Sequence, residues 1–387
     1  MEFILELAIM IAATKIAGHL SVRIGQPAVL GELIAGILFG PAVFGLIDAD
    51  SSFIHYFAEI GVLLLMFAAG LETDLDQLRR NWKPAFAVAV GGIIVPFIGG
   101  YAAAAAFGFG QTYALFFGVL FCATSVSISV QVLKEMNRLG SREGTTILGA
   151  AVVDDVLVVV LLAVMMSMLG SGEQISLGWL IGKKVLFFII VVLASIYLVP
   201  LAMKWLSKLK VTEPLIGVAL VVCFGFAYFA DYMGMAGIIG SFAAGIAISQ
   251  TPFRHQVEHK LEPITYGVFV PVFFVSIGLN VSFEGLGSQL GFVIVISAVA
   301  VVTKLLGGGL GARLTGFGRR SSLAVGTGMI SRGEVALIIA STGLQAGLLL
   351  EQYFTSVIIM VMVTTLVTPP LLKAVFSRMP EEGVSRS

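Results

Sequence analysis

Two adjacent carboxylates lie in the middle of a long apolar segment, where ionisable side chains are rare. Asp154 and Asp155 follow about nine residues of the apolar stretch 145–170. An ionised group at the centre of a bilayer costs on the order of 3 kcal/mol, so each such residue is a candidate functional residue. Consecutive helical residues point about 100° apart, so both carboxylates can reach one cavity without facing each other. Each therefore needs a partner of its own.

A lysine provides one of these partners. Lys304 is the only cation near the middle of the apolar segment 289–312. If one aspartate pairs with Lys304, the other remains available to a proton or to a cation, which compete for the same oxygen atoms. Alternating occupancy of one carboxylate by a proton and a cation is the basis of an exchange reaction.

Two apolar segments are interrupted by polar residues and glycines. Hydroxyl groups gather in 122–129, and three glycines lie in 326–334. Such interruptions are typical of broken transmembrane helices, whose free carbonyl groups and half-helix ends can coordinate ions. Thr124 and Ser125 are candidate oxygen ligands for a hard monovalent cation. The alternative is that these hydroxyls bond to carbonyls of their own helix.

A charge pair follows the second interruption. Arg332 and Glu334 could bind a substrate, but helical residues two apart do not face each other. We interpret them as charges that balance the dipoles of half-helices. Glu32, in another apolar segment, could line an ion path or pair with Lys15.

The polar stretch 251–262 is predicted to be an exposed cytoplasmic loop. His255 and His259 have the spacing of metal ligands, but Glu258 and Glu262 surround them, which is typical of a solvated surface. The sequence has no phosphate-binding glycine loop, no Cys/His cluster and no Ser/His/Asp arrangement, so we expect neither a cofactor nor an enzyme.

The composition excludes a soluble globular protein. Of the 387 residues, 58% are hydrophobic and 12% are charged, and Lys+Arg equals Asp+Glu at 23, which gives no basic excess for nucleic acid. A membrane-spanning helix needs about 20 apolar residues. The sequence predicts an all-α integral membrane protein with about 13 spans, which we place at 3–22, 27–46, 55–72, 84–107, 112–133, 145–170, 178–203, 212–231, 234–250, 263–281, 289–312, 321–347 and 352–376.

The basic residues predict the orientation of these spans. Alternate loops carry 18 of the 23 Lys and Arg residues, and the opposite loops carry none. Because basic loops stay in the cytoplasm, the N-terminus is expected outside and the C-terminus inside. The first segment lacks a basic start and a cleavage motif, so we expect it to be retained.

Similar sequences recur at an offset of 208 or 209 residues. Gly31–Ile37 resembles Gly240–Ile246, Phe67–Leu71 resembles Val275–Leu279, and Gly118 matches Gly326. The offset equals seven spans, and an odd number reverses the direction of crossing. The sequence therefore predicts two inverted six-helix repeats joined by a linker helix at 178–203.

The combined motifs resemble the bacterial monovalent cation:proton antiporter family, which includes sodium/proton antiporters of the NapA and GerN type and the membrane domain of Kef-type exchangers, here without a nucleotide-binding domain. The resemblance extends over essentially the whole chain. The motifs are Gln26–Pro41, Phe67–Asp74, Ala123–Ser125, Gly149–Asp155, Thr303–Lys304 and Arg332–Glu334.

The resemblance implies an architecture. It implies a homodimer in which a dimerisation domain stays still while a core domain moves like an elevator. The dimerisation domain would comprise 1–72 and 212–281, the core 84–170 and 289–376, and the cytoplasmic tail 377–387.

The resemblance also implies the roles of individual residues. Asp155 would bind the cation and the proton, and Asp154 would pair with Lys304. Thr124 and Ser125 would lie where the broken helices cross.

The function predicted from the sequence is exchange of sodium for protons across the bacterial cytoplasmic membrane, with net charge movement. The alternatives are potassium/proton exchange and, in the same fold, a symporter for organic anions. A channel would need a repeated carbonyl or charge ring, and none is visible. An intramembrane aspartyl protease needs two aspartates that approach from different helices, whereas Asp154 and Asp155 are adjacent on one helix.

Overall fold

The computed structural model describes residues 2–24, 26–48, 51–73, 75–168, 177–279 and 286–379, and within these ranges the regular structure is helical. Ten of the described helical segments are long and apolar enough to cross a membrane, and three shorter apolar helices accompany them. A helix satisfies its own backbone hydrogen bonds, which lipid cannot do. The prediction of an all-α, multi-pass membrane protein is confirmed.

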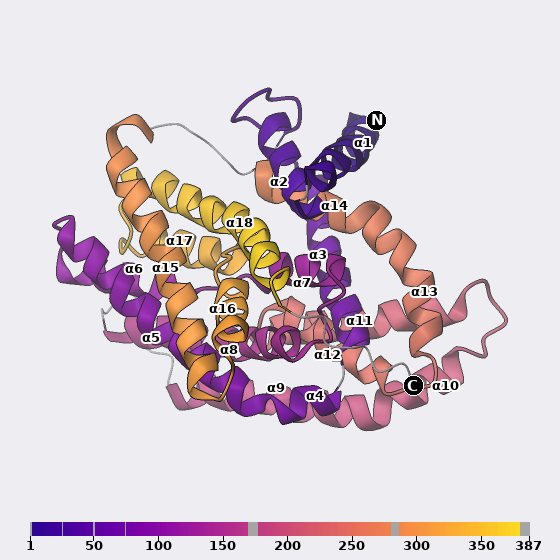
Figure 1. Cartoon of the computed structure of the whole chain (residues 1–387). Coiled ribbons are helices and arrows are strands. Elements are labelled where there is room, and N and C mark those ends of the chain that lie inside the picture. Colours follow the sequence, from indigo (N-terminus) through magenta and orange to yellow (C-terminus); the bar gives the residue numbers. More distant parts are fainter. Residues whose placement is uncertain are drawn as a thin grey trace. The chain divides into compact units, whose positions relative to one another are not determined.

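The helices belong to two compact units, and α1 and α2 contribute residues to both. The first unit comprises residues 1–19, 31–75 and 172–280 (Figure 1). Its helices are α1 (Glu2–Arg23), α2 (Ala28–Phe39), α3 (Ser52–Glu72), α9 (Leu177–Leu193), η1 (Ala194–Leu198), α10 (Val199–Leu206), α11 (Pro214–Tyr232), α12 (Gly237–Ser249), α13 (Arg254–Ile264), η2 (Thr265–Phe269) and α14 (Val270–Leu279).

Glycines let helices of the first unit approach each other at backbone distance. A Cβ added to Gly36 on α2 would collide with the Val275 carbonyl of α14, next to Gly278. A Cβ added to Gly245 on α12 would collide with the Phe67 carbonyl of α3, next to Gly70. Small residues at such crossings allow close packing in lipid, where no hydrophobic effect drives helices together.

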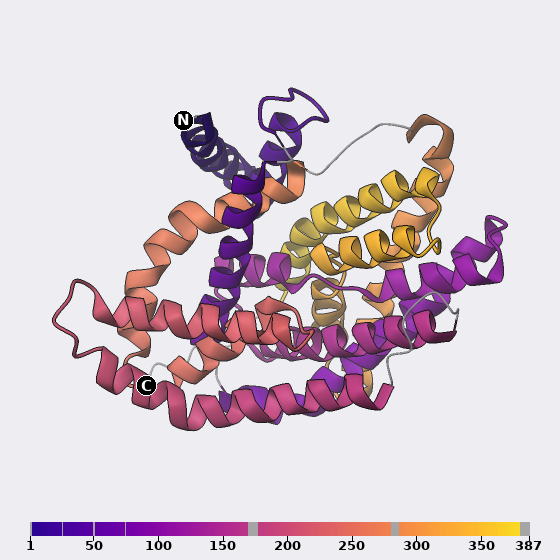
Figure 2. The ribbon, with the colours of Figure 1, turned by 180° about the vertical axis from the view of Figure 1, so that it is seen from behind.

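The second unit comprises residues 20–30, 76–171 and 281–387. Helices α17 and α18 run side by side in both views of this unit (Figure 1, Figure 2). Its helices are α4 (Leu75–Arg80, whose first residue belongs to the first unit), α5 (Trp82–Ala106), α6 (Gln111–Cys122), α7 (Val126–Glu135), α8 (Arg142–Met168), η3 (Leu286–Gln289), α15 (Leu290–Leu314), α16 (Arg319–Gly328), α17 (Glu334–Gln345), η4 (Glu351–Tyr353) and α18 (Phe354–Phe376).

Helices α5 and α15 cross at a second pair of glycines. A Cβ on Gly91 would collide with the Gly307 carbonyl, and a Cβ on Gly307 would collide with the Gly91 carbonyl. This crossing brings α15, which carries Lys304, against α5. Apolar side chains of α6, α8, α15, α17 and α18 pack into one core beside it.

The second predicted span is shorter than expected. Helix α2 ends at Phe39, and turns follow instead of the helix predicted up to residue 46. Pro41 disfavours a helical conformation at the residue before it, Gly40. Gly45 then adopts a positive φ of 60°.

The prediction of a loop at 251–262 is wrong, because α13 occupies most of it and continues through η2 into α14. Val257 and Leu261, four residues apart on one face, are buried and pack in the core that α11 and α12 share. Hydropathy did not predict this amphipathic helix, because most of its residues are polar. His255 on the other face is exposed, and its Nδ1 lies 3.7 Å from Glu258, as a solvated surface predicts.

Candidate functional site

Two interrupted helices meet in the second unit. The chain leaves helical geometry between α6 and α7 and again between α16 and α17. The Ser125 amide donates to the Ser331 carbonyl at 2.8 Å, and the Ser331 hydroxyl donates to the Ser125 carbonyl at 2.5 Å. The Ser129 hydroxyl also donates to the Gly328 carbonyl at 2.6 Å. Backbone groups released by each interruption are thus bound by the other segment.

Glycine makes this close approach possible. A Cβ on Gly333 would lie 2.7 Å from the side chain of Ser125, closer than real Cβ atoms come. The absence of a side chain on this residue therefore lets the second interruption lie against the first.

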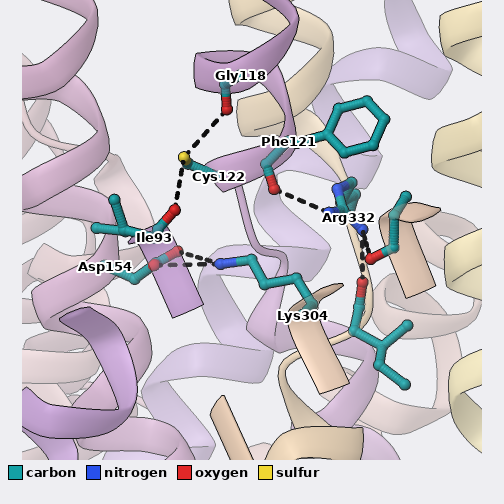
Figure 3. Close-up of polar contacts among 9 residues, drawn as sticks. Ile93, Gly118, Phe121, Cys122, Asp154, Lys304 and Arg332 are labelled. Carbon is teal, nitrogen blue, oxygen red and sulfur yellow. Dashed lines mark hydrogen bonds and ion pairs between the residues drawn. The ribbon is translucent and has the colours of Figure 1, made fainter. Parts of the chain in front are cut away.

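A buried ion pair lies beside the interruptions (Figure 3). The Lys304 ammonium on α15 lies 3.2 Å from Oδ1 and 3.4 Å from Oδ2 of Asp154 on α8. Both side chains are fully buried. Removing two charges from water is costly, and only their mutual attraction and hydrogen bonds offset the loss. The structure therefore pairs Lys304 with Asp154.

Asp155 is the more accessible of the two aspartates. Its exposed fraction is 9%, whereas Asp154 has none. Because the two residues are neighbours on α8, Asp155 points away from the Asp154–Lys304 pair by roughly a quarter turn. One carboxylate is thus paired with a lysine, and the other has a different environment.

Hydroxyl groups line the first interruption. Thr124 and Ser125 are both buried, and among the described residues neither hydroxyl has a hydrogen bond of good geometry. The Thr124 side chain nevertheless lies within interaction range of the Asp154 carboxylate. Within the part of the chain that the structure describes, neither hydroxyl bonds to a carbonyl of its own helix, which was the predicted alternative.

Arg332 binds backbone carbonyls from three segments. Its guanidinium donates to the Phe121 carbonyl at 2.8 Å, to the Ala300 carbonyl at 3.1 Å and to the Ile330 carbonyl at 3.2 Å (Figure 3). The side chain is fully buried. The carbonyl of Phe121 belongs to the C-terminal turn of α6, the negative end of that half-helix, so the guanidinium lies where a helix dipole favours a cation.

Cys122 is a further neighbour of the site. Its thiol donates to the Gly118 carbonyl at 3.2 Å and to the Ile93 carbonyl of α5 at 3.4 Å (Figure 3). A lone cysteine in an apolar run gives no sequence signal for such a contact.

The two remaining candidate residues, Glu32 and Glu334, are not among the contacts described above. Glu32 is buried on α2 in the first unit, and Lys15 donates to the Tyr266 carbonyl at 3.1 Å. Glu334 begins α17, and its side chain lies outside what the structure describes. Among the described residues, no group of three His, Cys, Asp or Glu side chains could hold a metal ion.

Comparison with known proteins shows which family has a sequence similar to this chain. A family model described as "Sodium/hydrogen exchanger, transmembrane" matches residues 8–378. "Probable Na(+)/H(+) antiporter GerT" of Bacillus cereus is 57% identical over 97% of this chain and 100% of the relative. "Na(+)/H(+)-K(+) antiporter GerN" of the same organism is 55% identical, over 97% and 96%. "Na(+)/H(+) antiporter" of Enterococcus hirae is 44% identical, over 96% and 98%.

The fold agrees with a solved structure. The map of the sodium proton antiporter MjNhaP1 from Methanocaldococcus jannaschii matches with a TM-score of 0.74 at 16% identity and covers 99% of both chains. The structure of the same protein at pH 8 matches with a TM-score of 0.65 at 15% identity and covers 97% of both chains. The broken helices and buried ion pair therefore lie in a member of the transmembrane sodium/hydrogen exchanger family, one of the bacterial monovalent cation:proton antiporters.

Proposed function

We propose that this chain exchanges sodium ions for protons across the bacterial cytoplasmic membrane, with Asp155 as the carrier of both. The observation that supports this most directly is the difference between the two aspartates, because Asp154 is fully buried and pairs with Lys304, whereas Asp155 is the more exposed of the two. Relatives at 44% to 57% identity carry the name of Na(+)/H(+) antiporters.

The exchange follows from competition on one carboxylate. A proton on Asp155 neutralises the group that would attract a sodium ion, and a bound sodium ion disfavours the proton. The Thr124 and Ser125 hydroxyls are buried oxygen atoms that can replace water molecules around an arriving cation. Arg332 binds backbone carbonyls from three segments near these hydroxyls. We assign Glu334, at the start of α17, the negative charge that balances Arg332.

Net transport also needs a movement, which we assign to the second unit. In this proposal the core comprises 84–170 and 289–376, and it carries the ion past a dimerisation domain formed by 1–72 and 212–281. The separation of the chain into two compact units supports this division. We further propose that the protein is a homodimer whose N-terminus is outside and whose C-terminal tail, 377–387, is cytoplasmic.

The glycine contacts support the proposed inverted repeats. At the offset of 208 or 209 residues, Gly36 corresponds to Gly245, and Gly70 corresponds to Gly278. Gly36 contacts Gly278, and Gly245 contacts Gly70, so each contact maps onto the other when the halves are exchanged. A pseudo-two-fold arrangement of the halves would produce this relation.

Potassium is the second candidate cation. GerN is named as a Na(+)/H(+)-K(+) antiporter, and neutral hydroxyl oxygens with one carboxylate suit both ions. Glu32, buried in α2, is our candidate for lining the path of either ion.

The test is transport by the purified protein in proteoliposomes that contain a pH-reporting dye. Addition of sodium or potassium chloride should dissipate an imposed pH gradient. Asp155→Asn should reduce this exchange to the protein-free background while leaving the protein folded. Asp231→Asn, at an exposed position on α11, is the matched control and should retain exchange. Exchange by the Asp155 variant at near the original rate would refute the assignment of the carrier.

A further inference from the structure

The C-terminal end of half-helix α7 carries a carboxylate, that of Glu135, which accepts three hydrogen bonds. Glu135 accepts a hydrogen bond from the Ala28 amide at 2.8 Å and from the Val29 amide at 3.3 Å, both in the first turn of α2. The Gln131 side-chain amide donates to the same carboxylate at 3.1 Å. All four residues belong to the second unit.

These contacts orient the Gln131 carboxamide. Its NH₂ group faces Glu135, which is an acceptor only, so its Oε1 atom must face the other way. Among the residues that the structure describes, that buried oxygen has no donor. The Oε1 atom of Gln26, two residues before Ala28, is also buried and without a donor there. Glu135 thus binds the NH₂ group of Gln131, and the two carboxamide oxygens of Gln131 and Gln26 have no donor among the described residues.

The same face of α7 leads back to the interrupted helices. Ser127, Gln131 and Glu135 follow one another at four-residue intervals, which places them in one row with a rise of about 6 Å per step. Ser127 is fully buried, and its hydroxyl has no partner among the described groups. Thr124 precedes Ser127 by three residues at the proposed carrier site.

We propose that the Oε1 atom of Gln131, oriented by Glu135, is an entrance site for the transported monovalent cation, and that Ser127 is the step between this site and Asp155. This inference rests on the proposed exchange of cations for protons. Carbonyl-type oxygens replace the hydration shell of a monovalent cation when they present lone pairs without competing donors. The nearby basic residues Lys134 and Arg138 each have a partner already.

The predicted location of the site makes it accessible from one side only. The basic residues around 134–142 predict that α7 ends in the cytoplasm. A cation that arrives from the cytoplasm therefore meets Gln131 before Asp155, and a cation that arrives from outside does not. The entrance site should then affect cation affinity on the cytoplasmic face alone.

Sided transport measurements test this. In inside-out vesicles, Gln131→Ala should raise the sodium KM about tenfold and leave kcat within twofold, which corresponds to about 1.4 kcal/mol of binding free energy. In right-side-out vesicles the same variant should keep the original KM. Gln250→Ala is the matched control, because Gln250 is an exposed glutamine immediately after α12, and both values should stay unchanged.

A second variant gives the opposite effect. Gln131→Glu keeps an oxygen ligand and adds a negative charge, so it should lower the sodium KM on the cytoplasmic face. Equal KM changes on both faces, or a fall in kcat with KM unchanged in both variants, would overturn the entrance site. If the unmodified protein shows no exchange with sodium or potassium, the proposed function fails instead, and the two failures are distinguishable.

Discussion

Asp154 and Lys304 are both fully buried and separated by 3.2 Å, so each charge depends on the other. Asp154→Asn would leave the lysine charge unpaired in an apolar environment. Loss of one partner of a buried pair costs about 3–5 kcal/mol. We expect a lower thermal unfolding temperature for this variant in detergent.

The double variant provides the control for this prediction. Asp154→Asn combined with Lys304→Gln removes both charges and should recover a large part of the lost stability, because no unpaired charge remains. Equal unfolding temperatures for the original protein and the Asp154 variant would show that the pair contributes nothing to stability.

Arg332 stabilises the crossing through the shape of its guanidinium as well as its charge. A lysine has a compact ammonium group on a flexible stem and cannot reproduce the planar fork that reaches carbonyls from three segments. Each buried acceptor left unsatisfied costs about 1–3 kcal/mol. Arg332→Lys should therefore lower the unfolding temperature clearly. Arg320→Lys, at an exposed residue that bonds to the Arg378 carbonyl, should leave it nearly unchanged.

Residue types indicated the candidate site and Lys304 as the partner of one aspartate, but by themselves they did not indicate which aspartate it would face. Mid-segment charges drew attention to Asp154, Asp155 and Lys304, since an isolated charge in lipid requires compensation. Which aspartate faces the lysine depends on the rotation of α8 against α15, and these residues are 150 positions apart. The carbonyl partners of Arg332 could not be predicted from the sequence, because every residue type has a backbone carbonyl.

At the scale of elements, glycines determine how closely helices cross. Gly245 on α12 is buried, and a methyl group there would collide with the backbone of α3. Gly245→Ala should therefore separate the two helices, lower the unfolding temperature and reduce the yield of folded protein. Overpacking of this kind costs about 1–3 kcal/mol.

Gly225→Ala is the matched control on α11. This glycine is exposed and has open space around its Cβ position. Alanine has a helix propensity about 1 kcal/mol better than glycine, so this variant should be at least as stable as the original protein. If both alanine variants behave alike, close packing at Gly245 is not important for stability.

The long apolar helices and both interruptions could be predicted, because hydropathy and glycine or hydroxyl clusters report on them directly. Helix α13 could not, since its charged face lowers the hydropathy while only Val257 and Leu261 are buried. The contact of Glu135 with the start of α2 was equally hidden, because it joins residues 107 positions apart through backbone amides.

At the scale of the whole molecule, the proposed exchange requires that bound ions change sides together with the unit that contains the buried pair. Both Asp154 and Lys304 belong to the second unit, so a movement of that unit would carry the pair without separating it. The number of charges that move in each cycle then depends on whether Lys304 keeps its proton throughout.

That dependence leads to a prediction about charge movement. If a cation that arrives at Asp155 draws Asp154 away from Lys304, the desolvated lysine can release a second proton. Two protons exchanged for one sodium ion move net charge, and transport should then respond to membrane potential by about 2.3 kcal/mol per charge per 100 mV. A sodium jump on a solid-supported membrane should give a transient current for the original protein. Lys304→Gln should show slower exchange without current. Exchange by the original protein without any current would make Lys304 a purely structural cation.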